Sequence, residues 1–318
     1  MDVSFVIPCY RSQNTILSVI GEIEQTMAQR PALRYEIICV SDGSPDQVYE
    51  VIAARSAQDR HVRGFCLAKN FGQQAAIMAG LNASTGDKVV VLDDDGQTPA
   101  DESFALLDAL DEDNDVVYAS YRWAQKMHSR FRNFGTWMNE TMLRILLKKP
   151  KGLEITSFWA AKRFAIDEIC CYTGPYAYTE GLILRSFGRI CNVPVRHRAR
   201  LEGESGYTLT KLLALWLNGF TAFSVVPLRA ASLLGVVSAV CGFLYMMYTV
   251  IHYFFDRDVP MGYPTLVSLI LLLSGVILVM LGLLGEYVGR LYITANRAPQ
   301  YVVRAACGAK EENGGTSK

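Results

Sequence analysis

The sequence predicts an α/β domain with a mostly parallel sheet, followed by amphipathic interfacial helices and a two-helix transmembrane hairpin. Over residues 1–120, short apolar runs alternate with helical patterns, which is typical of a parallel sheet with helices on both faces. Two later runs, Ala230–Phe255 and Val259–Gly285, contain no formally charged residue, and each exceeds the roughly 20 residues that cross a bilayer as a helix. Only 19% of the 318 residues are charged and the mean hydropathy is +0.17, as expected for a chain partly embedded in lipid.

The elements of the α/β domain follow one another in a regular order. The expected strands are the apolar runs Val3–Pro8, Tyr35–Ser41, Val62–Leu67, Lys88–Leu92 and Asp115–Ser120. The expected helices between them are Asn14–Gln29, Pro45–Gln58, Gln73–Ala83 and Ala100–Leu110. Ligands on sheets of this kind bind beyond the carboxyl ends of the strands, so we expect the functional residues there.

Two further segments have an amphipathic helical pattern. Residues 126–151 place aromatic and apolar side chains at helical spacing beside arginines and lysines, which is typical of a basic helix on an anionic membrane surface. Residues 209–223 form a second such segment and lead into the first apolar run. The alternative for both segments is a helix packed in a soluble domain.

The residues that flank the apolar runs predict their orientation. Arg229 precedes the first run, and Arg290, Arg297 and Arg304 follow the second. By the positive-inside rule both ends are cytoplasmic, so spans at about 230–255 and 263–288 form a hairpin with the N-terminal domain and both termini in the cytosol. The alternative is a buried helix pair of a soluble protein, which the length of the runs disfavours.

These patterns divide the chain into four parts. Residues 1–125 hold the strand–helix repeats, and residues 126–224 hold the rest of the domain with its interfacial helices. The two spans occupy residues 225–298. The remaining residues, 299–318, form a cytosolic tail whose polar, glycine-rich end is expected to be disordered.

Composition and missing motifs exclude several classes of function. The chain has 31 Lys and Arg against 31 Asp and Glu, so no excess of positive charge favours nucleic-acid binding. No GxGxxG motif follows the first strand and no GxxxxGK[ST] motif occurs, which argues against dinucleotide-dependent dehydrogenases and P-loop NTPases. The eight cysteines lack the spacing of a zinc site and suit a reduced compartment.

Two acidic turns follow strands of the predicted sheet. Asp42 and Gly43 come directly after the second strand, and Asp93-Asp94-Asp95 follow the fourth. Three successive carboxylates repel one another unless a cation lies among them, and Mg²⁺ or Mn²⁺ held by one or two carboxylates takes its remaining ligands from water and phosphates. The pattern therefore favours a metal and diphosphate site, with Asp42 accepting hydrogen bonds from a base or ribose. A solvated, helix-capping turn is the alternative for the acidic run.

Several segments in order resemble a known family. They are Val6-Ile7-Pro8-Cys9-Tyr10, the SDGSPD turn at 41–46, Lys69-Asn70-Phe71-Gly72-Gln73, the DDDGQTP segment at 93–99, residues 195–207 and the GEYVGRLY segment at 285–292. Together they resemble the GT-A (Rossmann-like) domain and membrane hairpin of inverting family 2 glycosyltransferases. The greater similarity is to the polyprenyl-phosphate glycosyltransferases, of the dolichyl-phosphate mannose synthase and bactoprenyl-phosphate glucosyltransferase type.

The resemblance implies a role for individual residues. The implied nucleotide-sugar contacts are Pro8, Tyr10, Asp42, Lys69, Gln73, Asp93, Asp94 and Gln97, and the implied ligands of Mg²⁺ or Mn²⁺ are Asp93 and Asp95. The implied lipid-phosphate site is Arg198, Arg200, Ser205 and Tyr207, since guanidinium forks and hydroxyls suit phosphate oxygens. The implied catalytic residues are Asp95, Glu154 and Arg200. For the two arginines, a membrane-proximal basic surface is the alternative.

One segment departs from the family pattern. The family commonly shows an acidic residue, a pair of small residues and then Phe-Arg, whereas this chain reads Glu154-Ile155-Thr156-Ser157-Phe158-Trp159. Glu154 is the best match for the acidic position, and Trp159 replaces the arginine. The departure affects which donor sugar the resemblance implies and whether Glu154 has the catalytic role of the family's acidic residue. Glu180 either lines the same pocket or lies on a surface helix, and the sequence leaves both open.

The resemblance implies transfer of a sugar from a nucleotide sugar, preferably a UDP-sugar, to polyprenyl (undecaprenyl) phosphate at the inner membrane. A phosphate oxygen would displace the nucleoside diphosphate with inversion, for modification of a cell-envelope glycan. The expected protein is a homo-oligomer, such as a tetramer. One alternative is a processive polysaccharide synthase, but Ala119 stands where the Gln-x-x-Arg-Trp motif ending at Arg122-Trp123 needs glutamine. The other is a non-catalytic scaffold of lipid-linked sugar translocation.

Overall fold

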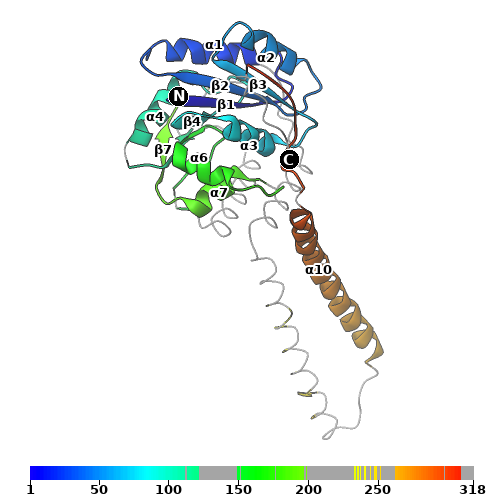
Figure 1. Cartoon of the computed structure of the whole chain (residues 1–318). Helices are drawn as coiled ribbons and strands as arrows, with labels where there is room; N and C mark the ends of the chain where they lie inside the picture. Colours follow the sequence, from blue (N-terminus) through cyan, green and yellow to red (C-terminus); the bar gives the residue numbers. More distant parts are fainter. Residues whose placement is uncertain are drawn as a thin grey trace. The chain divides into compact units, whose positions relative to one another are not determined.

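The computed structural model describes residues 1–111, 113–121, 149–150, 152–175, 177–196, 198, 262–296 and 298–308, with isolated residues between 233 and 251 (Figure 1). The chain forms two compact units, Met1–Gly206 with Arg297–Lys318, and Tyr207–Asn296. Several sequence predictions lie outside the described residues. They are nearly all of the amphipathic segment 126–151, the segment 209–223, the disordered end of the tail, and the side chains of Arg200, Ser205 and Tyr207.

An eight-stranded sheet forms the centre of the first unit, in the order β7-β5-β6-β4-β1-β2-β3-β8. The strands are β1 (Val3–Cys9), β2 (Tyr35–Ser41), β3 (Val62–Leu67), β4 (Lys88–Val91), β5 (Val116–Ser120), β6 (Trp159–Lys162), β7 (Ile190–Pro194) and β8 (Val303–Cys307). Neighbours β4, β1, β2 and β3 run parallel, as do β5 and β7. The prediction of a mostly parallel sheet is confirmed, and the five predicted strands lie within one residue of their expected ends.

Helices cover both faces of this sheet (Figure 1). They are α1 (Ile16–Met27), α2 (Val48–Ser56), α3 (Gln73–Ala83), the 3₁₀ turn η1 (Ala100–Glu102), α4 (Ser103–Asp111), α6 (Arg163–Cys170) and α7 (Thr179–Ser186). One core joins α1, α2 and α4 to strand residues such as Phe5 and Ile7, and a second core joins α3, α6 and α7 to Val6 on the opposite face. Alternate residues of β1 thus enter different cores, as the pleat of a strand covered on both faces requires.

Two antiparallel strands interrupt the parallel pattern. β6 lies between β4 and β5, and Trp159 at its start pairs with Val91 at the end of β4. Because the two strands run in opposite directions, the residues just before Trp159 lie at the carboxyl end of β4. β8 pairs with β3 in the same antiparallel sense, with Val303 opposite Leu67. The strands β6, β7 and β8 were not predicted from the sequence, and they have only four or five residues each.

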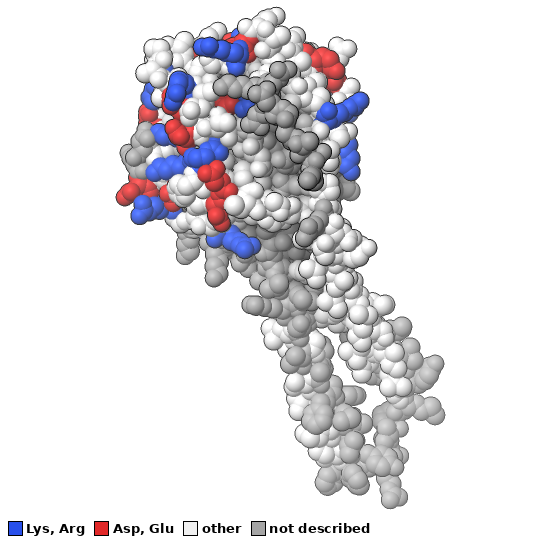
Figure 2. Space-filling view, viewed as in Figure 1, with Lys and Arg blue, Asp and Glu red and all other residues white. Residues whose placement is uncertain are grey.

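The second unit contains one long apolar helix among the residues described. This helix, α10, runs from Tyr263 to Ala295 with a proline in its first turn. Its part Leu273–Ala295 has a mean hydropathy of 1.7 and is not buried, and no other described helix is long and apolar enough to cross a membrane. Figure 2 shows charged side chains gathered on the globular unit and none on the described surface of the apolar helix. The first predicted span lies mostly outside the described residues, so the structure does not confirm a two-helix hairpin.

Candidate active site

Loops from three strands meet at the carboxyl edge of the sheet. They follow β1, β2 and β4, and hydrogen bonds connect them directly. The backbone N–H of Tyr10, after β1, donates to Oδ2 of Asp94, after β4, at 3.0 Å. The backbone N–H of Arg11 donates to Oγ of Ser44, after β2, at 2.8 Å. The first predicted acidic turn and the second therefore belong to one site.

Asp42 holds the turn after β2 against the loop before α3. The residue is 3% exposed, and its carboxylate accepts the backbone N–H groups of Phe71 at 2.7 Å and Gly72 at 2.9 Å. Burial raises the pKa of the Asp42 carboxyl, and these two hydrogen bonds partly offset the rise. Each carboxylate oxygen has a second lone pair, so the group retains acceptor capacity for a ligand.

Gly43 lets this turn approach the loop before α3. The residue has a φ of +56°, and a Cβ placed there would lie 2.2 Å from the backbone carbonyl carbon of Lys69. Only glycine fits so close a contact in the left-handed region. The Lys69 ammonium lies 5.0 Å from the centre of the Phe71 ring, and the Lys69 side chain is exposed at the edge of the site.

The three aspartates after β4 have different partners. Asp93 accepts the side-chain amide of Gln73 at 3.0 Å through Oδ1 and the hydroxyl of Ser157 through Oδ2. Asp95 accepts the backbone N–H of Gln97 at 3.0 Å. Asp94 binds the backbone of Tyr10, and its own carbonyl accepts the Thr15 hydroxyl at 2.7 Å. The side chain of Asp94 therefore connects the loops after β4 and β1, and all three aspartates are partly exposed.

The electrostatics of this acidic loop favour a bound cation. Burial raises the pKa of the Asp94 carboxyl to about 6, and the charges of Asp93 and Asp95 contribute to the rise. No cluster of three or more His, Cys, Asp or Glu side chains able to hold a metal occurs in the described part of the chain. Two carboxylates suffice for Mg²⁺ or Mn²⁺ when substrate phosphates and water complete the shell. Asp93 and Asp95 fit such a metal, and the groups that donate hydrogen bonds to Asp93 fix the orientation of its carboxylate.

Glu154 lies at the same edge of the sheet. Its carboxylate accepts the hydroxyl of Ser120 at the end of β5, and Asn192 of β7 binds both its backbone N–H, at 2.7 Å, and its carbonyl, at 2.8 Å. Tyr121 follows Ser120, and its hydroxyl forms a hydrogen bond with Thr98 at 3.2 Å. Burial raises the pKa of the Tyr121 phenol to about 12, with contributions from Asp93, Asp95 and Glu154. Glu154 thus lies in the same electrostatic neighbourhood as the acidic loop.

The remaining predicted residues occupy different positions around this edge. Pro8 is buried in β1, and Tyr10 is 44% exposed beside the acidic loop. The backbone N–H of Arg198 donates to the carbonyl of Gln97 at 2.8 Å. The guanidinium of Arg198 pairs with Glu22 at 2.9 Å. Arg198 is therefore attached to the acidic loop through its backbone.

Comparison with known proteins identifies the family. The glycosyl transferase family 2 model matches residues 4–170, which include β1, the acidic loop and Glu154. This chain belongs to glycosyltransferase family 2. A second model, the GtrB C-terminal hairpin, matches residues 226–291.

Two curated relatives match this glycosyltransferase over nearly the whole chain. An undecaprenyl-phosphate 4-deoxy-4-formamido-L-arabinose transferase of Yersinia enterocolitica is 33% identical and covers 97% of the chain and 94% of the relative. The uncharacterized glycosyltransferase YkcC of Bacillus subtilis is 30% identical and covers 97% and 95%. Among solved structures, a glucosyl-3-phosphoglycerate synthase of Mycobacterium tuberculosis aligns with a TM-score of 0.51 at 20% identity, over 69% of this chain and 76% of that one. This last similarity establishes the GT-A fold.

Several residues of the glycosyltransferase site were not predicted from the sequence. Ser157 binds Asp93, and Ser120 and Asn192 hold Glu154. Ser157 lies in the segment that departs from the family pattern. It reaches Asp93 because β6 is antiparallel, and nothing in the local sequence signals that direction. Ser120 is the last residue of β5, and Asn192 lies within β7. Only the order of these short strands in the sheet brings the two residues to Glu154.

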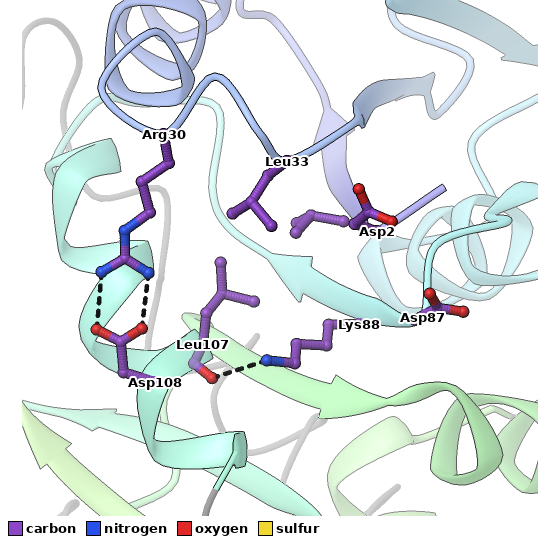
Figure 3. Close-up of a pocket in the computed structure, with 8 residues that line it drawn as sticks. Asp2, Arg30, Leu33, Asp87, Lys88, Leu107 and Asp108 are labelled. Carbon is purple, nitrogen blue, oxygen red and sulfur yellow. Dashed lines mark hydrogen bonds and ion pairs between the residues drawn. The ribbon is translucent and has the colours of Figure 1, made fainter.

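A separate cavity lies at the opposite edge of the sheet (Figure 3). It has a volume of about 180 Å³ and includes Asp2 and Val3 at the start of β1 and Lys88 at the start of β4. Three of its charged groups, Arg30, Asp108 and Lys88, already have partners within the domain. Arg30 forms two hydrogen bonds with Asp108, at 2.7 and 2.8 Å, and the Lys88 ammonium donates to the Leu107 carbonyl at 3.2 Å. The acidic loop, not this cavity, is the candidate active site of the glycosyltransferase.

Proposed function

We propose that this glycosyltransferase moves a sugar from a nucleoside diphosphate sugar to a polyprenyl phosphate at a membrane surface. The observation that carries the proposal is the meeting of the Asp93–Asp95 loop with the buried Asp42 turn, joined through Tyr10 and the loop before α3. A metal and diphosphate site next to a carboxylate that can accept hydrogen bonds from the base or ribose is the arrangement that a nucleotide sugar needs. The undecaprenyl-phosphate transferases among the relatives support undecaprenyl phosphate as acceptor, and the UDP complex of the aligned synthase supports a UDP-sugar donor.

The chain's own residues divide the work of this reaction. Asp93 and Asp95 would hold the metal, and Gln73 and Ser157 keep Asp93 in a fixed orientation. A bound Mg²⁺ or Mn²⁺ supplies positive charge for the leaving diphosphate, and the Mn²⁺ complex of the aligned synthase supports such an ion. Asp42 accepts hydrogen bonds from the base or ribose, while Lys69 and Tyr10 contact the nucleotide at the exposed edge.

The acceptor phosphate needs positioning more than activation. The second pKa of a phosphomonoester is about 6, so its oxygens are already nucleophilic at neutral pH without a strong base. In the proposal, Arg198, Arg200, Ser205 and Tyr207 hold this phosphate by charge and hydroxyl donors. Glu154, fixed by Ser120 and Asn192, orients the acceptor for displacement at the anomeric carbon with inversion.

The membrane part of the proposal concerns the hairpin. The match of residues 226–291 to the GtrB hairpin model and the exposed apolar helix α10 support two spans, with the catalytic domain and both termini on the cytosolic side of the inner membrane. Such a hairpin would bring a membrane-bound acceptor to the carboxyl edge of the sheet. We also propose a homo-oligomer, whose stoichiometry light scattering of the detergent-purified protein measures.

The testing experiment is single-turnover transfer from a panel of radiolabelled nucleotide sugars to undecaprenyl phosphate. Purified full-length protein is assayed with Mg²⁺, with Mn²⁺ and with EDTA. We expect an organic-extractable product that carries one sugar, depends on the metal, and appears with one donor of the panel. A polymeric product would instead indicate a processive synthase, and no product from any donor with folded protein would favour a scaffold.

Two variants connect the product to the acidic loop. Asp93→Asn and Asp95→Asn should each lower the transfer rate by about 10²–10³-fold, the loss typical of removing a fixed electrostatic group from an active site. The matched control is Asp113→Asn, because the Asp113 side chain is 99% exposed on the surface. Unchanged transfer by the folded Asp93 and Asp95 variants would contradict the proposed metal site.

A further inference from the structure

The first two residues of α3 bind two different carboxylates. The side-chain amide of Gln73 donates to Asp93 at 3.0 Å, within the candidate active site. The side-chain amide of Gln74 donates to both carboxylate oxygens of Glu180 at 3.1 Å. Consecutive side chains thus attach one helix end to the acidic loop and to α7.

Both the nitrogen and the oxygen of the Gln74 side-chain amide form hydrogen bonds. While its nitrogen donates to Glu180, its oxygen accepts the backbone N–H of Thr179 at 2.9 Å and the Thr179 hydroxyl at 2.7 Å. Thr179 is the first residue of α7, and Tyr178 before it provides no side-chain cap. The first N–H groups of a helix lack partners within the helix, so Gln74 satisfies one that α7 leaves open.

The start of α3 also lacks a cap of its own. Gly72 precedes the helix with a φ of +97° and has no side chain to accept an N–H of the first turn. In the described part of the chain, Asp42 binds the backbone N–H of Gly72, and the side chains of the first turn itself that form hydrogen bonds to other elements are Gln73 and Gln74. A shift of the first turn moves the Gln73 amide away from Asp93.

Glu180 is a costly residue to keep at this position. Burial raises the pKa of its carboxyl, and the negative charge of Asp93 contributes to the rise. Among the described residues, its hydrogen-bond donors are neutral: the Gln74 amide and its own backbone N–H, with the Thr179 hydroxyl, which donates mainly to Gln74, at 3.4 Å. A carboxylate that is shielded from water and has only neutral donors lowers stability. The proposed transfer reaction assigns no task to Glu180.

We propose that Gln74 and Glu180 form a positioning pair, which fixes the first turn of α3 against α7 and so holds Gln73 on Asp93. The pair acts on the reaction through Gln73 and does not touch the substrates. The effect on transfer rests on the proposed function, whereas the effects on metal affinity and on the helix end do not depend on the reaction.

An exchange of the two side chains tests this pair. Gln74→Glu opposes two carboxylates, while Glu180→Gln keeps an oxygen that can accept the Gln74 amide. In the double variant, a carboxylate at position 74 still accepts both Thr179 donors and also accepts the amide at position 180, so the hydrogen bond between positions 74 and 180 is restored with donor and acceptor exchanged. We measure Mn²⁺ affinity of the full-length protein by electron paramagnetic resonance, and amide hydrogen exchange of residues 73–77.

The expected pattern follows from the hydrogen bonds. Gln74→Glu should weaken Mn²⁺ binding about fivefold, somewhat less than the tenfold or greater loss typical of removing a direct partner of a metal ligand. It should also speed exchange at the start of α3. Glu180→Gln and the double variant should stay within about twofold of the wild type in both measurements. In the transfer assay, Gln74→Glu should raise the donor KM and the metal requirement together.

Two results would contradict the proposal. The first is that the double variant loses as much Mn²⁺ affinity and exchange protection as Gln74→Glu. The second is that Glu180→Gln loses as much as Gln74→Glu, because the charge of Glu180 itself would then be needed. Gln25→Ala and Glu50→Gln, exposed residues of α1 and α2, are the matched controls and should match the wild type. If the wild type binds Mn²⁺ but transfers no sugar, the proposed function fails while metal affinity and hydrogen exchange still decide the pair.

Discussion

The Asp42 carboxylate and the backbone N–H of Gly72 form a 2.9 Å hydrogen bond, which joins the end of β2 to the residue that precedes α3. Oδ1 of the same carboxylate accepts the N–H of Phe71 at 2.7 Å. One buried side chain thus fixes the position of the loop before α3, and with it the position from which Gln73 donates to Asp93. Asp42 shapes the site in addition to any contact with a nucleotide.

Removal of this carboxylate should disorganise the loop before α3. Asp42→Ala leaves two half-buried N–H groups without their acceptor, at a cost of about 1–3 kcal/mol. We expect the melting temperature to fall by about 5 °C, given a ΔΔG near 2 kcal/mol in a domain of this size. Binding of UDP with Mn²⁺ should weaken at least tenfold. Differential scanning fluorimetry and equilibrium dialysis measure the two effects.

Asp113→Ala is the control for the aspartate removal, since its partner Arg189 is also on the surface. An exposed ion pair of this kind contributes little to stability, so its melting temperature should stay within about 1 °C of the wild type. Equal UDP affinity in the Asp42→Ala variant and the control would show that the loop does not depend on Asp42.

Gly43 provides a second test of the same loop. Gly43→Ala requires alanine to adopt a φ of +56°, which costs roughly 1–2 kcal/mol, and it drives a Cβ against the backbone of Lys69. We expect a lower melting temperature and weaker UDP binding. The matched control is Gly21→Ala in the middle of α1, where a Cβ meets nothing within 4 Å and alanine is the better helix former. The control should therefore be as stable as the wild type or more stable, and a Gly43→Ala variant that behaves like it would contradict the close contact.

The sequence predicted the first half of the fold well because each element there carries its own signal. β2, β3 and α3 have the expected bounds, since apolar runs and helical periodicity are local properties. The strands β6, β7 and β8 are too short to show a period, and their places depend on pairing with strands far away in the chain. β8 follows the apolar helix by several residues and still joins β3, which no local pattern indicates.

The residues of the candidate site were likewise predicted only in part. Acidic residues directly after strands predicted that Asp42 and the Asp93–Asp95 loop would meet, and their backbone contacts agree with this expectation. The side chains that orient Asp93 are Gln73 and Ser157. Gln73 belongs to a segment that resembles the family motif, whereas Ser157 reaches Asp93 only through the antiparallel β6.

The raised pKa of Asp94 makes stability depend on pH. Its carboxyl has a pKa of about 6 in the folded domain, chiefly because of burial, against 3.8 for the unfolded chain. Between these values the folded state binds more protons, so the contribution of Asp94 is full below about pH 4 and is lost as the pH rises through about 6. The loss is at most about 3 kcal/mol.

Asp94→Asn removes this dependence and keeps an oxygen to accept the N–H of Tyr10. In EDTA, the melting temperature of the wild type relative to this variant should fall as the pH rises from 4 to 7. A constant difference between the two proteins over this range would mean that Asp94 titrates in the folded state as it does in the unfolded chain. Addition of Mn²⁺ should reduce the difference at pH 7, because a cation between Asp93 and Asp95 offsets their repulsion of Asp94.

Ser157 offers a test of how the metal carboxylate is oriented. Its hydroxyl donates to Oδ2 of Asp93, while Gln73 holds Oδ1, so the two donors fix the plane of the carboxylate. Ser157→Ala should weaken Mn²⁺ binding about tenfold, as expected when a partner of a metal ligand is removed. Ser157→Thr keeps the hydroxyl and should restore most of the affinity. Ser186→Ala, at the exposed end of α7, controls for loss of a serine. Equal Mn²⁺ affinity in the alanine variant and the wild type would mean that Gln73 alone orients Asp93. The antiparallel direction of β6 would then contribute to the fold but not to metal binding.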